Sequence, residues 1–316
     1  MVEDFDNKLL DNMAKTLKSE STISTYQKRL KSINDMCKGQ GYMYFLTNPK
    51  SVYKKMLVCY PGKTATRGNL ITAITKLFSS NDVLLTKYPE KYNTWKGYLT
   101  LERKEENARY DTNKPTEKQT KNLVDYGDVV NTYHSMRQSV LTKGFSDKIH
   151  NLEFLLLSVM INLRPKRADL GDVIFVKKDP QDKMRARNYI ILNGTPILVV
   201  NKYKMAYQNG AIIEDINPQL QEDILLSLKH YPRKYLFVDK DCNPYTNNAY
   251  GLFVQRTFYK YFGKKTGVNL WRHIHITEKI NPLVMPMSEL KAEAKLMGHR
   301  VSSQQSVYLW KNMKSE

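Results

Sequence analysis

Apolar residues spaced three and four positions apart run through most of this chain, and this spacing constrains its fold more than any other feature. It predicts helices over about 5–18, 24–38, 49–59, 64–79, 123–140, 150–162, 218–230, 246–262, 269–280, 287–297 and 302–310. Two short apolar runs instead flank Asn193-Gly194, a pair that supplies the positive φ of a hairpin turn. Strands are therefore expected at 188–192 and 197–200, with shorter ones at 211–214 and 235–238. The predicted fold class is mainly α with a small antiparallel sheet.

A polar stretch divides the helical pattern into two parts. Between about Lys104 and Lys121 the sequence is rich in Lys, Glu, Asn and Thr, contains Pro115, and has almost no apolar residues. Such a composition is typical of an exposed linker. We therefore expect a helical domain at 1–108, a linker at 109–122 and a second domain at 123–316.

The charge of the chain is strongly positive. Fifty Lys and Arg residues face 31 Asp and Glu, which gives a net charge of +19 and a pI of about 9.6. This balance favours a polyanionic partner, and nucleic acid is the most common one. The alternative is a generically basic protein whose lysines form a solvated surface.

The cysteines and the apolar runs indicate where the protein works. Cys37, Cys59 and Cys242 form no Cys-x-x-Cys pair, so neither a disulfide framework nor a zinc finger is indicated. The start Met-Val-Glu-Asp does not resemble a secretory signal, and the longest apolar run is too short to cross a bilayer. We expect an intracellular protein without a membrane partner, in the cytoplasm or a host nucleus, wherever its nucleic-acid partner lies.

The C-terminal part of the chain contains arginine, histidine and tyrosine in a defined order. Arg272 and His273 end the segment 269–273, His299 follows a glycine, and Tyr308 comes nine positions after His299. Breaking a phosphodiester without a metal requires a nucleophile, cations that offset the charge of the pentacoordinate phosphate, and an acid for the leaving oxygen. Arginine suits the second role because its planar guanidinium pairs with two phosphate oxygens.

In this order and spacing, the segments 269–273 and 298–308 resemble the tyrosine recombinases of the phage integrase family. The resemblance implies a clamp of a helical core-binding domain and a catalytic domain around double-stranded DNA. It further implies that Tyr308 attacks a phosphate to form a 3′ phosphotyrosine, without metal, ATP or another cofactor. By the same resemblance, the protein is monomeric off DNA and a homotetramer on paired recombination sites, where 309–316 could contact a neighbour. The segment 110–119 is similar to relatives in mobile elements and large DNA viruses of eukaryotes.

The resemblance also assigns catalytic roles to residues around the predicted hairpin. Arg167, supported by Asp169, matches the first arginine of the family, and Arg164 is the alternative. Both arginines could instead cap the end of the preceding helix. Lys204 matches the general-acid lysine, with Lys202 as a substitute, although either could be an ordinary solvated lysine.

Asn269 stands where the family usually has a histidine. An asparagine can donate a hydrogen bond to a phosphate oxygen but cannot carry a proton. His273 is usually a buried structural partner in the family, and a supporting role near the DNA phosphate is the alternative. His273 and His275 point to different faces of a helix, so we expect no metal site. Tyr308, with its apolar neighbours, could by itself be a core tyrosine.

The first domain contains two segments, 21–26 and 63–67, that resemble the starts of core-binding helices that lie across the major groove. Lys28, Lys63 and Arg67 are the DNA contacts expected there. Two other functions remain open. One is relaxation of supercoiled DNA by a type IB topoisomerase, which uses the same chemistry as a monomer. The other is DNA binding by a protein that has lost catalysis, which the departure at Asn269 allows.

Overall fold

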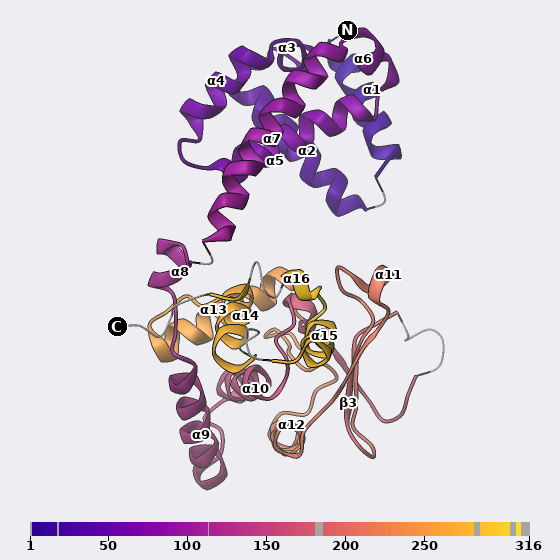
Figure 1. Cartoon of the computed structure of the whole chain (residues 1–316). Coiled ribbons are helices and arrows are strands. Elements are labelled where there is room, and N and C mark those ends of the chain that lie inside the picture. Colours follow the sequence, from indigo (N-terminus) through magenta and orange to yellow (C-terminus); the bar gives the residue numbers. More distant parts are fainter. Residues whose placement is uncertain are drawn as a thin grey trace. The chain divides into compact units, whose positions relative to one another are not determined.

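The computed structural model describes residues 2–17, 19–112, 114–180, 186–280, 285–303 and 308–310. The chain divides into two compact units, Met1–Thr112 and Asn113–Glu316 (Figure 1). Each unit has its own cluster of buried apolar side chains. Among the described residues, no helix is both long and apolar enough to cross a membrane.

The first unit is helical in its described residues, with α1 (Val2–Lys15), α2 (Glu20–Met36), α3 (Tyr42–Thr47), α4 (Pro49–Cys59), α5 (Thr64–Ser79), α6 (Asp82–Lys87) and α7 (Pro89–Asp111). The apolar stripes expected on α2 and α5 are buried, as Ile33 and Ile74 illustrate. They pack around Trp95 of α7, whose side chain has no exposed surface. The core of this unit therefore forms where α5 crosses α2 and α7.

Helix α7 extends through Asp111, into the segment expected to be a linker. A second helix, α8 (Glu117–Lys121), follows and begins with a capping box between Thr116 and Gln119. The buried side of α7 includes Glu102 and Glu106 as well as Trp95. These carboxylates interrupt the apolar stripe, which is why the spacing of apolar residues does not reveal this helix.

Arg67 corrects one of the sequence-based expectations, because it does not lie on a DNA-facing surface. Its side chain is buried, and Nε and Nη2 donate to the carboxylate of Glu102 at 2.6 and 2.9 Å. Nη1 donates to the carbonyl of Tyr60 at 2.6 Å, and Tyr53 completes the cluster with a 2.8 Å bond to Glu102. All three guanidinium nitrogens are therefore bonded inside the unit, and Arg67 joins α5 to α7.

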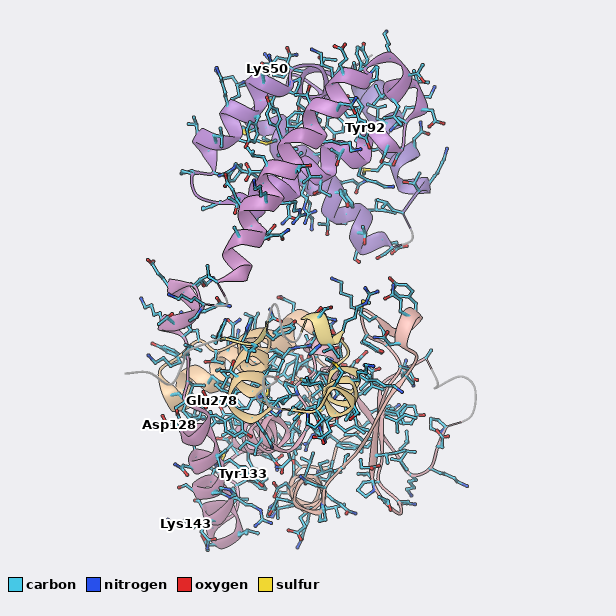
Figure 2. The ribbon with its side chains drawn as sticks, viewed as in Figure 1. Lys50, Tyr92, Asp128, Tyr133, Lys143 and Glu278 are labelled. Atoms are coloured by element: carbon cyan, nitrogen blue, oxygen red, sulfur yellow. The ribbon has the colours of Figure 1, made fainter. Side chains whose placement is uncertain are left out.

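Besides α8, the described helices of the second unit are α9 (Tyr126–Lys143), α10 (Lys148–Asn162), η1 (Ala168–Leu170), α11 (Ala206–Asn209), α12 (Pro218–His230), α13 (Asn247–Phe262), α14 (Val268–His275), η3 (Ile276–Ile280), α15 (Met287–Leu296) and α16 (Val301–Ser303). Helix α10 is buried over most of its length, as expected for a helix that is apolar on all sides. Tyr133 points from α9 into this core, where its hydroxyl donates to Asp223 at 2.5 Å (Figure 2).

The sheet of the second unit is mixed, whereas an antiparallel sheet was expected. Its strands are β1 (Ile174–Val176), β2 (Tyr189–Ile191), β3 (Ile197–Val200) and β4 (Ile212–Asp215), in that order across the sheet. β2, β3 and β4 are antiparallel neighbours, but β1 pairs with β2 in parallel. The connection 177–188 is long enough to return the chain to the end of the sheet where β1 began, as a parallel pair requires.

Three expected elements differ in part from the structure. The segment 235–238 forms only the isolated bridges Ile174–Tyr235 and Val238–Pro244. The helix expected at 269–280 is α14 followed by the wider π-helical turn η3. The helix expected at 302–310 is seen as α16 alone. Residues 304–307, and 311–316 of the expected subunit contact, lie outside the described residues.

Candidate active site

The Tyr308 side chain lies close to four of the candidate site residues predicted from the sequence. The guanidinium carbon of Arg272 lies 4.9 Å from the centre of the Tyr308 ring. The rings of His273 and His299 have their centres 4.9 and 5.2 Å from that of Tyr308. The tyrosine hydroxyl lies 3.5 Å from Oδ1 of Asn269, at the long limit for a hydrogen bond. Residues from α14, the end of α15 and the C-terminal segment thus form one cluster.

Tyr308 is itself only 6% exposed and belongs to a small apolar cluster with Ile276, Ile280, Leu290 and Met297. These contacts fit a core tyrosine as well as a positioned one. Its hydroxyl, however, is directed to Asn269, which is exposed at the start of α14. The reactive atom of the side chain therefore lies at the edge of the cluster.

His273 holds the segment that carries Tyr308. Its Nδ1 donates to the Tyr308 carbonyl at 3.2 Å, and its ring stacks on Trp310 with centres 4.4 Å apart. The Trp310 amide donates in turn to Oγ1 of Thr277 at 3.2 Å. Burial lowers the pKa of His273 to about 4, so the ring is neutral at pH 7. The His273 side chain is therefore packed inside this cluster and is not exposed for a contact with DNA.

Arg272 is fully buried yet only partly bonded. Its Nη2 donates to the Met297 carbonyl at 3.1 Å, while Nε and Nη1 have no partner among the described residues. Burial lowers its pKa to about 10; Tyr308 opposes this shift and the charge of Arg167 adds to it. A buried donor without an acceptor costs about 1–3 kcal/mol. Two such donors on one cation form a site that an anion with two acceptor oxygens would complete.

His299 presents a second buried atom without a partner. Gly298 before it has φ +68°, and a Cβ there would lie 3.1 Å from the Tyr203 ring, so both conformation and space require glycine. The Nδ1 of His299 donates to the Arg300 carbonyl at 3.1 Å, which leaves Nε2 as an acceptor with no partner among the described residues. Burial, and then the charge of Arg272, lower the pKa of His299 to about 4. A neutral ring of this tautomer can accept a proton.

The structure distinguishes the two candidates for the first arginine. Arg164 is held by carboxylates: its backbone amide donates to Glu214 at 3.0 Å, and its Nη2 donates to Glu293 at 2.8 Å. The Arg167 side chain makes no hydrogen bond or ion pair with the described residues. Its charge contributes to lowering the pKa of both Arg272 and His299. Arg167 is thus the better candidate, and Arg164 fastens the turn to α15.

Asp169 interacts electrostatically with Arg167 and Arg272. The charges of Arg167 and Arg272 lower its pKa, but burial has the larger effect and raises it overall. The carboxylate therefore offsets part of the positive charge without forming an ion pair that would occupy either guanidinium. This arrangement agrees with a supporting role for Asp169.

Lys166 and Glu214 form a buried ion pair that the sequence did not reveal. Lys166 Nζ contacts the Glu214 carboxylate and also donates to the Arg164 carbonyl at 3.0 Å. Burial lowers the pKa of Lys166 in spite of the paired carboxylate. One signal was available: Glu214 is two residues after Ile212 on β4, so strand alternation puts both on the buried face.

The two candidate lysines lie after β3, in its connection to α11. Lys202 and Lys204 are exposed, and neither Nζ is bonded to a described residue. Tyr203 between them packs against Gly298, and Arg300 Nη2 donates to Gln208 of α11 at 3.2 Å. The connection thus lies beside the histidine segment, but no contact joins either lysine to Tyr308.

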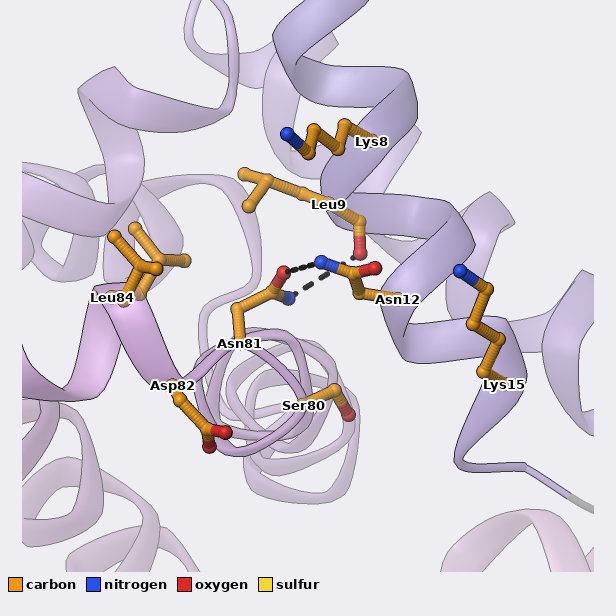
Figure 3. Close-up of a pocket in the computed structure, with 9 residues that line it drawn as sticks. Lys8, Leu9, Asn12, Lys15, Ser80, Asn81, Asp82 and Leu84 are labelled. Carbon is orange, nitrogen blue, oxygen red and sulfur yellow. Dashed lines mark hydrogen bonds between the residues drawn. The ribbon is translucent and has the colours of Figure 1, made fainter.

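The first unit contributes exposed lysines and a separate cavity. Lys28 on α2 and Lys63 before α5 are exposed, as a DNA contact requires. A cavity of about 530 Å³ lies between α1 and the α5–α6 junction (Figure 3). Asn12 and Asn81 in this cavity bond to each other at 2.9 Å, and no candidate catalytic residue lines it. Among the described residues, no cluster of His, Cys, Asp and Glu is placed to hold a metal ion.

Comparison with known proteins adds little to these observations. No protein-family model matches the sequence, and no curated protein matches it. One solved structure that aligns with it is the crystal structure of XerA recombinase, at 12% identity and a TM-score of 0.41. That alignment covers 97% of this chain and 94% of the XerA chain. A TM-score of this size does not establish a shared fold, so the chemistry of the site has to be inferred from its own residues.

Proposed function

We propose that this protein is a site-specific DNA recombinase that cuts and rejoins strands through Tyr308. The observation that carries the proposal is the buried Arg272, which faces the Tyr308 ring with two donors unbonded. The His299 ring, with Nε2 unbonded, lies against the same tyrosine, and the charge of Arg167 acts on Arg272. A phosphodiester is an anion with two non-bridging oxygens, and it matches this set of groups in charge and in hydrogen bonding.

In the proposed reaction the Tyr308 oxygen bonds to phosphorus as the bond to the 5′ oxygen breaks. Nε2 of His299 accepts the tyrosine proton, and Lys204, with Lys202 as its substitute, protonates the leaving oxygen. Arg167 and Arg272 offset the charge of the pentacoordinate phosphate. Asn269 orients the tyrosine hydroxyl but moves no proton, because an amide does not titrate.

The product would be a 3′ phosphotyrosine and a free 5′ hydroxyl. A 5′ hydroxyl from a second duplex can then attack the phosphotyrosine, which restores one phosphodiester for each one broken and needs neither ATP nor a metal. Exchange between two duplexes requires four active sites, which is the reason for proposing a homotetramer on paired sites. The proposed partner is double-stranded DNA, contacted by exposed lysines such as Lys28 and Lys63 in the first unit.

A nicked suicide substrate tests this proposal. The short strand 3′ of the cut diffuses away, so a covalent protein–DNA adduct accumulates on the intact protein. We expect Tyr308→Phe to abolish the adduct, whereas Tyr207→Phe, a matched change at a tyrosine that is 81% exposed, leaves it unchanged. Absence of an adduct from the intact protein, or its persistence in Tyr308→Phe, would refute the assignment. Relaxation of supercoiled DNA without strand exchange would identify a topoisomerase instead.

A further inference from the structure

Asn188 connects two segments of the candidate site that are far apart in the sequence. It lies directly before β2, and its side chain is 1% exposed. Its Nδ2 donates to the Asp169 carbonyl at 2.8 Å and to the Lys202 carbonyl at 3.1 Å. Its Oδ1 accepts a bond from the Lys202 amide at 2.8 Å. One buried amide thus bonds both to the turn that follows Arg167 and to the connection that carries Lys202 and Lys204.

The backbone of Asn188 is itself held in place by the sheet. The backbone carbonyl of Asn188 accepts a bond from the Ile174 amide at 3.0 Å, at the start of the β1–β2 pairing. In the described part of the chain, no hydrogen bond joins 163–170 directly to 201–205. Among the described residues, the Asn188 side chain therefore links the arginine turn to the lysine connection by hydrogen bonds.

We propose that Asn188 is a positioning residue for proton transfer to the leaving oxygen. Arg167 binds the phosphate, and a lysine after β3 must reach the 5′ oxygen of that same phosphate. A general acid acts only within hydrogen-bond reach of the atom it protonates. Asn188 holds the two segments at the separation that satisfies both requirements. This inference rests on the proposed function, since it concerns one step of that reaction.

A substrate with sulfur in place of the bridging 5′ oxygen separates positioning of the acid from other roles. The Tyr308 oxygen bonds to phosphorus, the phosphorus–sulfur bond breaks, and a thiolate leaves with the electron pair. A thiol is acidic enough to leave without protonation, unlike an alcohol. A defect confined to proton delivery therefore disappears on this substrate, whereas a defect in phosphate binding or folding does not.

We expect Asn188→Ala to slow cleavage of the oxygen substrate by about 10²-fold, the lower end of what general acid catalysis contributes. On the sulfur substrate its rate should return to within a few-fold of the intact protein, as should that of Lys204→Ala, or of Lys202→Ala if Lys202 is the acid. Asn201→Ala is the matched control, because Asn201 is in the same connection and its side chain donates to the Arg187 carbonyl at 2.9 Å, with no bond to the described residues of the arginine turn. It should cut both substrates normally.

Equal loss on both substrates would overturn the role of Asn188. Asn188→Asp, which keeps the side-chain volume but removes both donated bonds, serves as a second variant if Asn188→Ala does not fold. Each variant is measured at saturating DNA, with its thermal unfolding recorded alongside. Failure of the proposed function is distinguishable from this outcome, because the intact protein would then cut neither substrate.

Discussion

At the scale of single residues, the clearest sign of function is a side chain that the fold does not fully satisfy. Arg272 is fully buried and Arg233 is half-buried, and burial lowers the pKa of both to about 10. Arg233 nevertheless bonds through all its nitrogens, to Leu236, Tyr231 and Ser227 among others. Arg272 has one bond. The same residue type thus has its donors bonded within the fold at one position, whereas at the other two donors remain available to a ligand.

This contrast predicts opposite results for two matched substitutions. Arg272→Met should leave the free energy of unfolding within about 1 kcal/mol of the intact protein, because an incompletely bonded buried charge adds little stability. It should nevertheless lower the rate of adduct formation by at least about 10²-fold. Arg233→Met should cost about 3 kcal/mol or more, because several bonds to a charged group are lost. Urea unfolding and the adduct assay measure both, and a large loss of stability in Arg272→Met would make that residue structural.

The buried histidines predict how stability depends on pH. Burial lowers the pKa of His273 and His299 to about 4 and that of His275 to about 3, below the value of about 6.5 for an unfolded chain. Between these values the unfolded chain binds more protons, so the stability from these groups is complete above about pH 6.5 and is lost as the pH falls toward 4. Over this pH range, His275→Gln should reduce the slope of the free energy of unfolding against pH by about 1.4 kcal/mol per pH unit. Urea unfolding at several pH values checks this, and an unchanged slope would contradict it.

At the scale of elements, the helices were largely predictable because burial follows their apolar spacing. The strands β2, β3 and β4 lie within a residue of their expected positions for the same reason. β1 was missed because three residues, Ile174–Val176, carry no readable alternation. Its parallel pairing also depends on a connection, and no local pattern of residues specifies where a connection ends.

The candidate site was predictable where its residues lie close together in the sequence, as in 269–273 and 298–308. What sequence could not reveal were partners brought together by folding. Lys166 resembles any surface lysine until Glu214 is placed against it. Arg67 resembled a DNA contact until α7 supplied Glu102. The charge on a side chain is visible in the sequence, but its neutralisation by a distant residue is not.

The contact between α5 and α7 carries its own prediction. Arg67→Ala should destabilise the protein by about 3–5 kcal/mol, because it leaves the buried carboxylate of Glu102 without its cation. Arg67→Met combined with Glu102→Leu should recover most of that loss, since neither charge then remains buried. Urea unfolding compares the variants with Lys63→Ala, whose exposed side chain should not affect stability. A loss below about 1 kcal/mol in Arg67→Ala would place the guanidinium at the surface after all.

At the scale of the whole molecule, the net charge of +19 is the property that any DNA-binding proposal must explain. This sum is the excess of 50 Lys and Arg over 31 Asp and Glu, and some of those cations are paired inside the fold, as at Arg67, Arg164 and Lys166. The exposed lysines are different, because Lys28 and Lys63 have no carboxylate partner among the described residues. The cations available to DNA are therefore fewer than the 50 Lys and Arg of the sequence, and the fold decides which of them are unpaired.

The salt dependence of DNA binding measures how many cations contact phosphates. Each phosphate that a cation neutralises on duplex DNA adds about 0.9 to the slope of log affinity against log salt, so 6–10 contacts would lower affinity by about 10³–10⁵ between 50 and 200 mM salt. Lys28→Gln and Lys63→Gln should each reduce the slope by about one unit if these lysines meet phosphates. Tyr308→Phe, which changes no charge, should leave it unaltered. Fluorescence anisotropy with the full chain measures these slopes; a nearly flat dependence in the intact protein would mean that its positive charge does not serve to bind DNA.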